Sequence, residues 1–190
     1  MRIKVLYEDT NILAIDKPAG ISVQNDEKST DKTVLDFVVK KYKKAELVHR
    51  LDKDTSGVLL IAKNAKAYEF LKQQFQARTV KKIYHTVVSG FMKEDRGVIN
   101  KPIGRSPSDF RRRLAGRGAR GELREAITEY KVLKRFEAKA QEFFPRSSLP
   151  RVRGGAHTLK KPSAPSLEKF TYLEVMPKTG RTHQIRVHMK

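Results

Sequence analysis

The sequence has 190 residues and carries 41 lysines and arginines against 21 aspartates and glutamates, a formal net charge of +20. This length suits one substantial core, so we expect a single domain over residues 1–190. The charge excess favours a polyanionic partner such as nucleic acid over a neutral one. No apolar run approaches the length of a membrane-spanning helix and no apolar signal region follows Met1, so we expect a cytoplasmic protein that does not enter a membrane. The sequence has no cysteine, which excludes disulfides and thiolate metal sites.

The first half of the chain alternates short apolar runs with amphipathic segments. The runs are rich in branched residues and bounded by polar turns, which is typical of strands. The amphipathic segments place apolar side chains at helical spacing, and Asp31 or Thr33 is a possible N-cap of the first one. We predict strands at residues 3–7, 12–16 and 58–62, and helices at residues 33–44 and 65–77.

The second half is richer in strands and contains two irregular segments. Residues 100–121 are rich in arginine and glycine and predict a loop. Residues 137–166 contain four prolines and many cations, and we interpret them as a basic insertion that orders on RNA, with a mobile surface loop as the alternative. We predict strands at residues 83–90, 126–136 and 170–176, then a turn and a helix capped by Thr182.

One polar segment stands directly before the predicted strand at residues 58–62, where loops often hold binding and catalytic residues. Within it Asp52 lies between Arg50 and Lys53, and such cations favour the ionised form of a carboxylate. Asp52 is therefore a candidate nucleophile or base. An ordinary turn in which Gly57 has a positive φ explains the segment equally well. The segment is His49-Arg50-Leu51-Asp52-Lys53-Asp54-Thr55-Ser56-Gly57.

Four segments together resemble the RluA-type pseudouridine synthases. The segment His49–Gly57 is similar to that family's catalytic motif, and Lys82-x-Tyr84 is similar to its tyrosine motif. The opening from Tyr7 to Gly20 fits its N-terminal signature. All four occur in the family's order and cover the chain from end to end, which makes the resemblance specific. The remaining segment, similar to the third motif, is Gly180-Arg181-Thr182-His183-Gln184-Ile185-Arg186-Val187-His188.

The resemblance implies an α+β fold with a mixed, mainly antiparallel sheet and flanking helices. It implies site-specific conversion of uridine to pseudouridine in structured RNA, ribosomal or transfer, without a cofactor. Asp52 would be the catalytic carboxylate and Arg186 the cation paired with it, because a buried carboxylate needs such a partner. Tyr84 would stack on the displaced base or move a proton. Without the motifs, Arg186 would be a surface residue and Tyr84 a packed strand tyrosine.

The target base must leave the stack before it can react, so the resemblance also implies a pocket for a flipped nucleotide. Arg50 would fill the vacated space, since a planar guanidinium stacks on bases. Ile185 would line the pocket or pack in the core, and His49 would support the loop through hydrogen bonds. His183 and His188 are five positions apart, a spacing that does not favour metal binding on one helix face, so we expect no metal.

Basic residues outside the catalytic motif are candidates for RNA contacts. Such residues would bind phosphates and set the register of the RNA without reading its sequence. A solvated charged surface is the alternative. The candidates are Lys82, Arg105, Arg111, Arg112, Arg113 and Arg181, of which Arg181 is equally suited to a scaffolding role.

The sequence departs from the family pattern at its ends. Relatives continue with a strand and turn after the third motif, whereas this sequence stops at Lys190, so we expect a domain truncated at its C-terminus. No S4-type RNA-binding module precedes Met1, and we expect a monomer. Two other functions remain open at this point. One is a non-catalytic rRNA-binding or ribosome-assembly protein that keeps the fold, and the other is an RNA glycosidase or nuclease.

Overall fold

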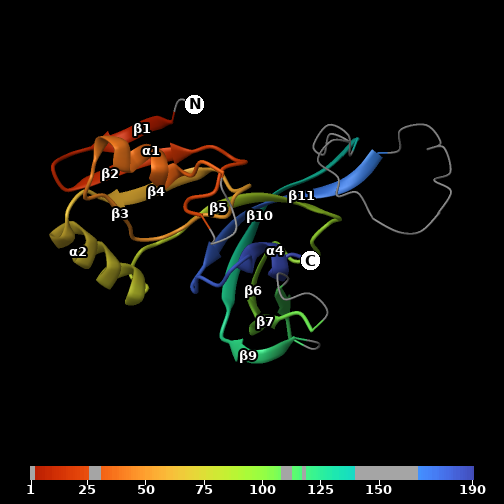
Figure 1. The fold of residues 1–190 in the computed structure, drawn as a ribbon. Helices are drawn as coiled ribbons and strands as arrows, with labels where there is room; N and C mark the ends of the chain where they lie inside the picture. Colours follow the sequence, from red (N-terminus) through yellow and green to blue (C-terminus); the bar gives the residue numbers. More distant parts are fainter. Residues whose placement is uncertain (1–2, 26–30, 108–112, 117–118, 140–166) are drawn as a thin grey trace. The chain divides into compact units, whose positions relative to one another are not determined.

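The computed structural model describes residues 3–25, 31–107, 113–116, 119–139 and 167–190. The chain divides into two compact units, Met1–Lys81 and Lys82–Lys190, which Figure 1 shows in red to yellow and in green to blue. No helix within these described ranges is long and apolar enough to cross a membrane.

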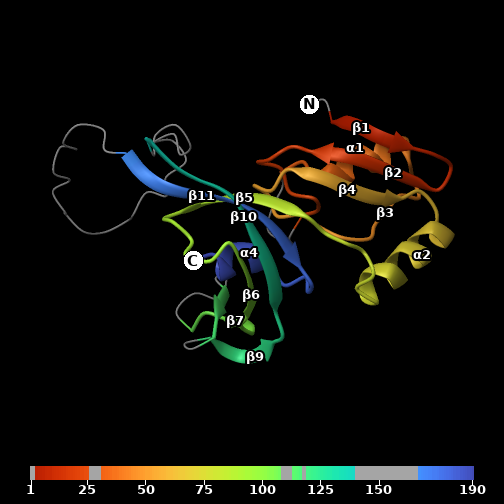
Figure 2. The same ribbon diagram turned by 180° about the vertical axis from the view of Figure 1, so that it is seen from behind.

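The first unit is built on a four-stranded antiparallel sheet with the strand order β1-β2-β4-β3. The turn after β1 is closed by Asp9, whose carboxylate accepts hydrogen bonds from the backbone N–H groups of Asn11 and Ile12 at 2.7 Å each. Figure 2 shows the strands side by side from behind. The strands are β1 (Lys4–Glu8), β2 (Ile12–Lys17), β3 (Glu46–Leu47) and β4 (Gly57–Ala62).

Two helices complete the first unit, and each begins at a side-chain cap. Helix α1 (Val34–Lys41) has Thr33 as its N-cap, in a capping box with Asp36. Helix α2 (Ala65–Gln76) is capped by Asn64, which accepts a hydrogen bond from the N–H of Ala67 at 2.9 Å. Both predicted helices are confirmed, although α1 ends three residues before the predicted boundary.

The second unit contains a larger antiparallel sheet, a small one and a short helix. Phe170, Leu173 and Val175 are fully buried and form the centre of its core. The larger sheet has the order β5-β11-β10-β6, with β5 (Tyr84–Ser89), β11 (Leu167–Pro177), β10 (Ile127–Lys139) and β6 (Arg96–Asn100). The small sheet has the order β8-β7-β9, with β8 (Arg113–Ala115), β7 (Ile103–Arg105) and β9 (Arg120–Arg124), and the helix is α4 (Gln184–His188).

The α+β class with mainly antiparallel sheets is confirmed, and three local predictions are wrong. Residues 100–121 are not one loop but contain strands. The prediction missed them because strands of three residues between glycines show no visible alternation of apolar and polar side chains. Residues 137–139 continue β10 instead of opening the insertion, and the rest of that insertion lies outside the described residues. The last helix begins at Gln184, so Thr182 is not its N-cap. Strands β3 and β6 were not predicted.

One cross-strand contact in the larger sheet explains why residue 97 is a glycine. Gly97 of β6 lies opposite Tyr130 of β10, and the tyrosine ring covers the glycine backbone. A Cβ added at Gly97 would lie 2.5 Å from the Tyr130 hydroxyl oxygen and 2.7 Å from two ring carbons. An aromatic ring packed over a strand glycine supplies the contacts that the missing side chain cannot make.

We expect Gly97→Ala to destabilise the protein by about 1–3 kcal/mol, because the ring must move away from its packed position. The midpoint of urea unfolding measures this change. In a Tyr130→Ala background the same substitution should cost little or be favourable. Equal costs in both backgrounds would show that the Tyr130 ring is not what excludes a side chain at Gly97.

Candidate functional site

The polar segment His49–Gly57 connects β3 to β4 in the first unit. Leu51 is buried, and the adjacent Asp52 is half-buried. The backbone carbonyl of Asp52 accepts a hydrogen bond from the N–H of Thr55 at 3.1 Å, so Asp52 is the first residue of a tight turn. Gly57 has a φ of 125°, which confirms the positive value expected from the sequence. The turn fixes the backbone of the half-buried Asp52 next to an anchoring leucine.

His49 fastens the start of this segment to two elements of the first unit. Its Nε2 accepts a hydrogen bond from the N–H of Leu60 in β4 at 2.9 Å. Its ring stacks on Phe75 of α2, with 4.7 Å between centroids and 17° between planes. Because Nε2 is the acceptor, the neutral ring carries its proton on Nδ1. His49 therefore supports the loop, whereas the neighbouring Arg50 is exposed.

A lysine buried at the end of β2 holds the middle of the segment. The Lys17 side chain is fully buried, and its ammonium donates to three backbone carbonyls, those of Pro18 at 2.8 Å, Ile21 at 2.8 Å and Lys53 at 3.0 Å. The N–H of Gly20 donates to the same Lys53 carbonyl at 2.9 Å. The carbonyl that follows Asp52 is therefore held by two donors from the end of β2 and the turn after it.

The charge of this lysine interacts with two carboxylates of the segment His49–Gly57. Burial lowers the pKa of the Lys17 ammonium from its ordinary value, and the carboxylates of Asp54 and Asp52 act in the opposite direction. No role was predicted for Lys17 from the sequence, although the alternation of β2 indicates that its side chain is buried. Leu13 and Ile15 are buried, and Lys17 occupies the next inward position.

In the second unit, Tyr84 begins β5 and is opposite Val175, which is in turn opposite Tyr130 of β10. Residues opposite one another in a sheet share a face, and so do residues two apart in one strand. Thr128 is therefore on the face that carries Tyr84. Helix α4 bonds to Thr128 and so packs on that same face. The sheet register thus brings Tyr84 and the helix that carries Arg186 to one face of the second unit.

Helix α4 is anchored by the buried side chain of Gln184. Its Oε1 accepts from the Thr179 hydroxyl at 2.7 Å and from the N–H of Arg181 at 3.0 Å. Its Nε2 donates to the carbonyl of Ile127 at 3.0 Å and to the Thr128 hydroxyl at 2.9 Å. All four hydrogen-bonding positions of the amide are used.

His188 continues this network at the other end of the helix. Its Nδ1 pairs with the Thr128 hydroxyl at 2.8 Å, and its Nε2 pairs with the carbonyl of Lys101 at 2.9 Å. A carbonyl only accepts, so Nε2 carries the proton and Nδ1 accepts from Thr128. Both ring nitrogens of His188 thus serve the fold. Within the described ranges, no group of three histidine, aspartate or glutamate side chains is arranged to hold a metal ion.

Ile185 and Arg186 lie on α4 between these two anchors. Ile185 is half-buried and Arg186 is exposed. The preceding His183 has a φ of 57°, a left-handed conformation that is uncommon outside glycine and asparagine. His183 is the N-cap residue, and no side-chain hydrogen bond caps this helix.

Two of the predicted RNA-binding residues make contacts that organise the protein itself. The Nε of Arg181 donates to the carbonyl of Glu125 at 2.9 Å. The ammonium of Lys82 donates to the carbonyl of Thr179 at 3.4 Å. These contacts match the scaffolding alternative for Arg181 and tie the start of β5 to the turn before α4.

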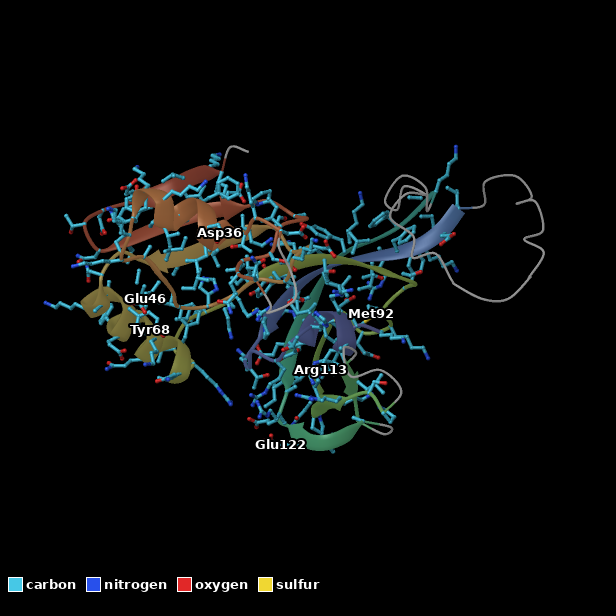
Figure 3. The ribbon with its side chains drawn as sticks, viewed as in Figure 1. Asp36, Glu46, Tyr68, Met92, Arg113 and Glu122 are labelled. Atoms are coloured by element: carbon cyan, nitrogen blue, oxygen red, sulfur yellow. The ribbon has the colours of Figure 1, made fainter. Side chains whose placement is uncertain are left out.

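Two more of the predicted cations, Arg105 and Arg113, are neighbours in the small sheet. Arg105 of β7 is opposite Arg113 of β8 on one side and opposite Arg120 of β9 on the other. Figure 3 labels Arg113 in this sheet. None of the described acidic side chains forms a salt bridge with Arg105 or Arg113, and like charges placed opposite one another destabilise a sheet. Arg105 and Arg113 thus form a pair of opposed cations that an anion would stabilise. Arg111 and Arg112 lie outside the described residues.

Comparisons with known proteins agree with the motifs. The sequence model of the family described as RNA pseudouridylate synthase matches residues 11–190. An uncharacterised RNA pseudouridine synthase of Aquifex aeolicus is 36% identical over 98% of this chain and 51% of its own length. Ribosomal large subunit pseudouridine synthase D of Pseudomonas aeruginosa is 35% identical over all of this chain and 50% of its own length. The chain thus spans about half the length of these relatives.

Solved structures agree with the fold. The human RNA pseudouridylate synthase domain containing 1 superimposes with a TM-score of 0.72 at 23% identity, over 98% of this chain and 64% of that one. The human RNA pseudouridylate synthase domain containing 4 gives a TM-score of 0.66 at 25% identity, over 97% of this chain and 62% of that one.

We expect Lys17→Met to destabilise the protein by about 3 kcal/mol, because three carbonyls would lose their ammonium donor while the buried methylenes stay in place. The free energy of unfolding in urea measures this loss. Lys53→Met is the matched control, because its ammonium is exposed and 3.6 Å from the exposed Asp31. The control should change stability by less than about 0.5 kcal/mol. Equal stability of the two variants would contradict the role given to Lys17.

Proposed function

Since the chain belongs to the RNA pseudouridylate synthase family, and to its RluA type, we propose that it converts uridine to pseudouridine in structured RNA. The observation that carries this proposal is the turn built around Asp52. The motif expected to hold the catalytic carboxylate is fixed to three parts of the first unit, and Asp52 itself is half-buried and accessible.

The reaction sets the requirements that the site must meet. The bond between N1 of uracil and C1′ of ribose breaks, the base turns, and C5 bonds to C1′. The proton on C5 is lost and N1 gains a proton, so the product has the same mass as the substrate. No oxidant or reductant takes part. The enzyme needs a carboxylate at the nucleoside, a closed space that retains the freed base, and a group that handles the C5 proton.

The described side chains suit these roles. We assign the carboxylate to Asp52, and to Arg186 the cation that balances it once the nucleotide excludes water. An exposed guanidinium on a helix anchored at both ends is available for such a pairing. Tyr84 supplies a ring for stacking and a hydroxyl for proton transfer.

Three further residues are assigned to the flipped nucleotide. Arg50 is exposed and next to the catalytic turn, which suits insertion into the gap left by the base. Ile185 is half-buried beside Arg186 and supplies an apolar wall. His49 acts on the pocket through its bonds to β4 and α2 and so positions the turn.

Electrostatics support RNA as the substrate. The register places the cations Arg105 and Arg113 opposite one another, and phosphates of an RNA strand would offset their repulsion. The name of the Pseudomonas aeruginosa relative specifies the large ribosomal subunit, which makes ribosomal RNA the first substrate to test and transfer RNA the second. Mapping pseudouridine in total RNA with and without the gene identifies the target.

We expect Asp52→Asn to lower pseudouridine formation by at least about 10⁴-fold while RNA affinity stays within about twofold, because only the reacting carboxylate is lost. Chemical labelling of pseudouridine measures the product, and fluorescence anisotropy measures binding. In the Asp52→Asn background, Arg186→Gln should have no further effect on product, because the two residues act as one unit.

Three results would contradict this assignment. Full turnover by Asp52→Asn would exclude Asp52 as the catalytic group. Binding without product from the unaltered protein on its mapped RNA would favour the non-catalytic assembly protein. Free uracil or shortened RNA would favour a glycosidase or nuclease.

We expect replacement of Arg111, Arg112 and Arg113 by alanine to weaken binding of all RNAs to a similar degree. Phosphate contacts carry no sequence information, so the slope of log affinity against log salt should decrease by about 2–3. Titrations of cognate and unrelated RNA at several salt concentrations measure both effects. Loss of affinity for the cognate RNA alone would mean that these arginines contact bases.

A further inference from the structure

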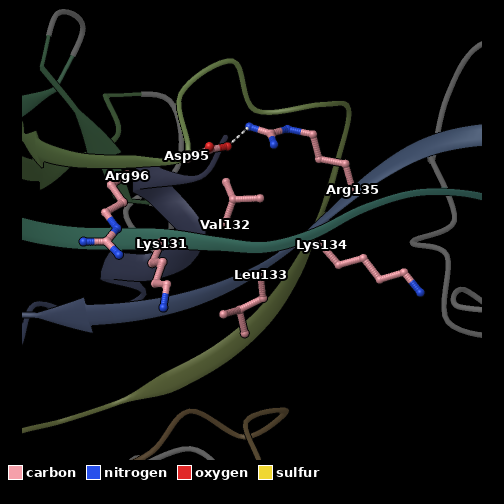
Figure 4. A pocket seen from close by; sticks show the side chains of 7 residues that line it. All are labelled: Asp95, Arg96, Lys131, Val132, Leu133, Lys134 and Arg135. Atoms are coloured by element: carbon pink, nitrogen blue, oxygen red, sulfur yellow. Dashed lines mark ion pairs between the residues drawn. The ribbon is translucent and has the colours of Figure 1, made fainter.

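A second basic site lies in the larger sheet of the second unit, outside every motif of the sequence. A pocket of about 400 Å³ is located where β10 runs past the end of β6 (Figure 4). Its volume is within the range of pockets that bind small ligands. The lining consists of Asp95, Arg96, Lys131, Val132, Leu133, Lys134 and Arg135.

A β-bulge shapes this pocket. The register between β10 and β11 shifts between Val132 and Lys134, so Leu133 is an extra residue that bends the strand. The pairing of β10 with β6 ends at Lys131, and the N–H of Val132 then donates to the carbonyl of Asp95 at 2.7 Å. Beyond this point β6 no longer pairs with β10, and Leu133 is exposed.

Arg135 forms the wall of the pocket and is already engaged. Its guanidinium makes a 2.7 Å salt bridge with Asp95 and donates to the carbonyls of Met92 at 2.8 Å and Lys93 at 3.3 Å. These bonds hold the segment before β6 against β10. Arg135 is therefore a positioning residue.

Besides Arg135 the lining has three cations, and Lys134 points away from Arg96 and Lys131, which are left to bind a ligand together (Figure 4). They are directly opposite one another on β6 and β10, and Figure 4 shows their side chains side by side. On its other side Lys131 is opposite Glu174 of β11. No described carboxylate lies within salt-bridge distance of either Arg96 or Lys131. Two opposed cations destabilise a sheet unless an anion lies between them.

We propose that Arg96 and Lys131 bind a phosphodiester of the RNA substrate, with the exposed Leu133 beside it against the sugar or base. This inference rests on the proposed function for the identity of the anion. Lys131 and Tyr130 are adjacent in β10 and so point to opposite faces. The subsite is therefore on the face of the sheet opposite Tyr84, and it contacts RNA away from the reacting nucleotide.

RNA fits this subsite better than an isolated anion does. Arg96 and Lys131 are both exposed, so they would hold one isolated phosphate weakly. A strand that also contacts Arg105 and Arg113 of the small sheet would bring a phosphate here at a high effective concentration. The protein's net charge of +20 adds long-range attraction for the same ligand.

The double variant Arg96→Gln/Lys131→Gln tests the subsite. The probes are a fluorescein-labelled RNA stem-loop and a labelled oligouridylate, titrated at several salt concentrations. We expect a loss of affinity of at least about fivefold for both and a salt slope lower by about 1–2. The matched control is Lys43→Gln/Lys44→Gln, which removes the same charge from exposed positions of the first unit and should lower affinity by less than about twofold.

Two further readouts separate binding from folding. The melting temperature of the double variant should be unchanged or higher, because a like-charge pair is removed. Lys131→Arg keeps the charge and should keep wild-type affinity. If both double variants weaken binding equally, net charge alone explains the effect and the subsite is refuted. If Lys131→Arg binds as weakly as the double variant, a folding defect explains the loss and the subsite is refuted.

Kinetics separate this inference from the proposed function. On the mapped RNA, the double variant should raise KM by at least about fivefold and leave kcat unchanged, because the contact is remote from the chemistry. A lower kcat with unchanged KM would refute a remote binding role. If the protein makes no pseudouridine but the double variant alone loses RNA affinity, the proposed function fails and the subsite stands. If product forms and affinity is unchanged, the subsite fails and the function stands.

Discussion

A single buried ammonium links the first sheet to the turn of the catalytic motif. An ammonium removed from water is costly unless each proton has an acceptor, and Lys17 finds three backbone carbonyls. Two are in the turn after β2, and the third follows Asp52. Any shift of the motif relative to β2 would leave a buried charge without its full set of acceptors. The backbone of Asp52 is therefore fixed by the fold of the first unit itself, and the catalytic role proposed for Asp52 would require such preorganisation.

The second unit achieves similar placement without a buried charge. Helix α4 has five residues, too few to be stable alone. Gln184 and His188 hold it to the sheet through a network in which each hydrogen-bonding group has a defined direction. The Thr128 hydroxyl accepts a hydrogen bond from Gln184 and donates one to His188. This series of hydrogen bonds ends at the Lys101 carbonyl. Arg186 and Ile185 are then presented from a rigid segment of the second unit.

The sequence predicted the elements whose pattern is long and regular, such as β2, β4, β5 and α2. It did not predict the small sheet, because strands as short as Ile103–Arg105 show no alternation among arginines and glycines. The motifs identified the candidate residues of the site, but they did not identify the residues that hold these candidates in place. His188 was considered only as a metal ligand, and Lys17 was given no role. Their partners, Lys101 and Lys53, are 87 and 36 residues away in the chain, and no local pattern encodes such pairs.

The distribution of charge separates stability from binding in the second unit. Its buried polar groups are neutral and fully paired, and no buried side-chain polar atom of the described residues lacks a partner. Its exposed strands, by contrast, place Arg105 opposite Arg113 and Arg96 opposite Lys131. Such registers weaken a free sheet, since cross-strand pairs of opposite sign would stabilise it. A core held by neutral hydrogen bonds can tolerate this cost. A bound polyanion would relieve this repulsion, so the same cations would favour a complex with RNA.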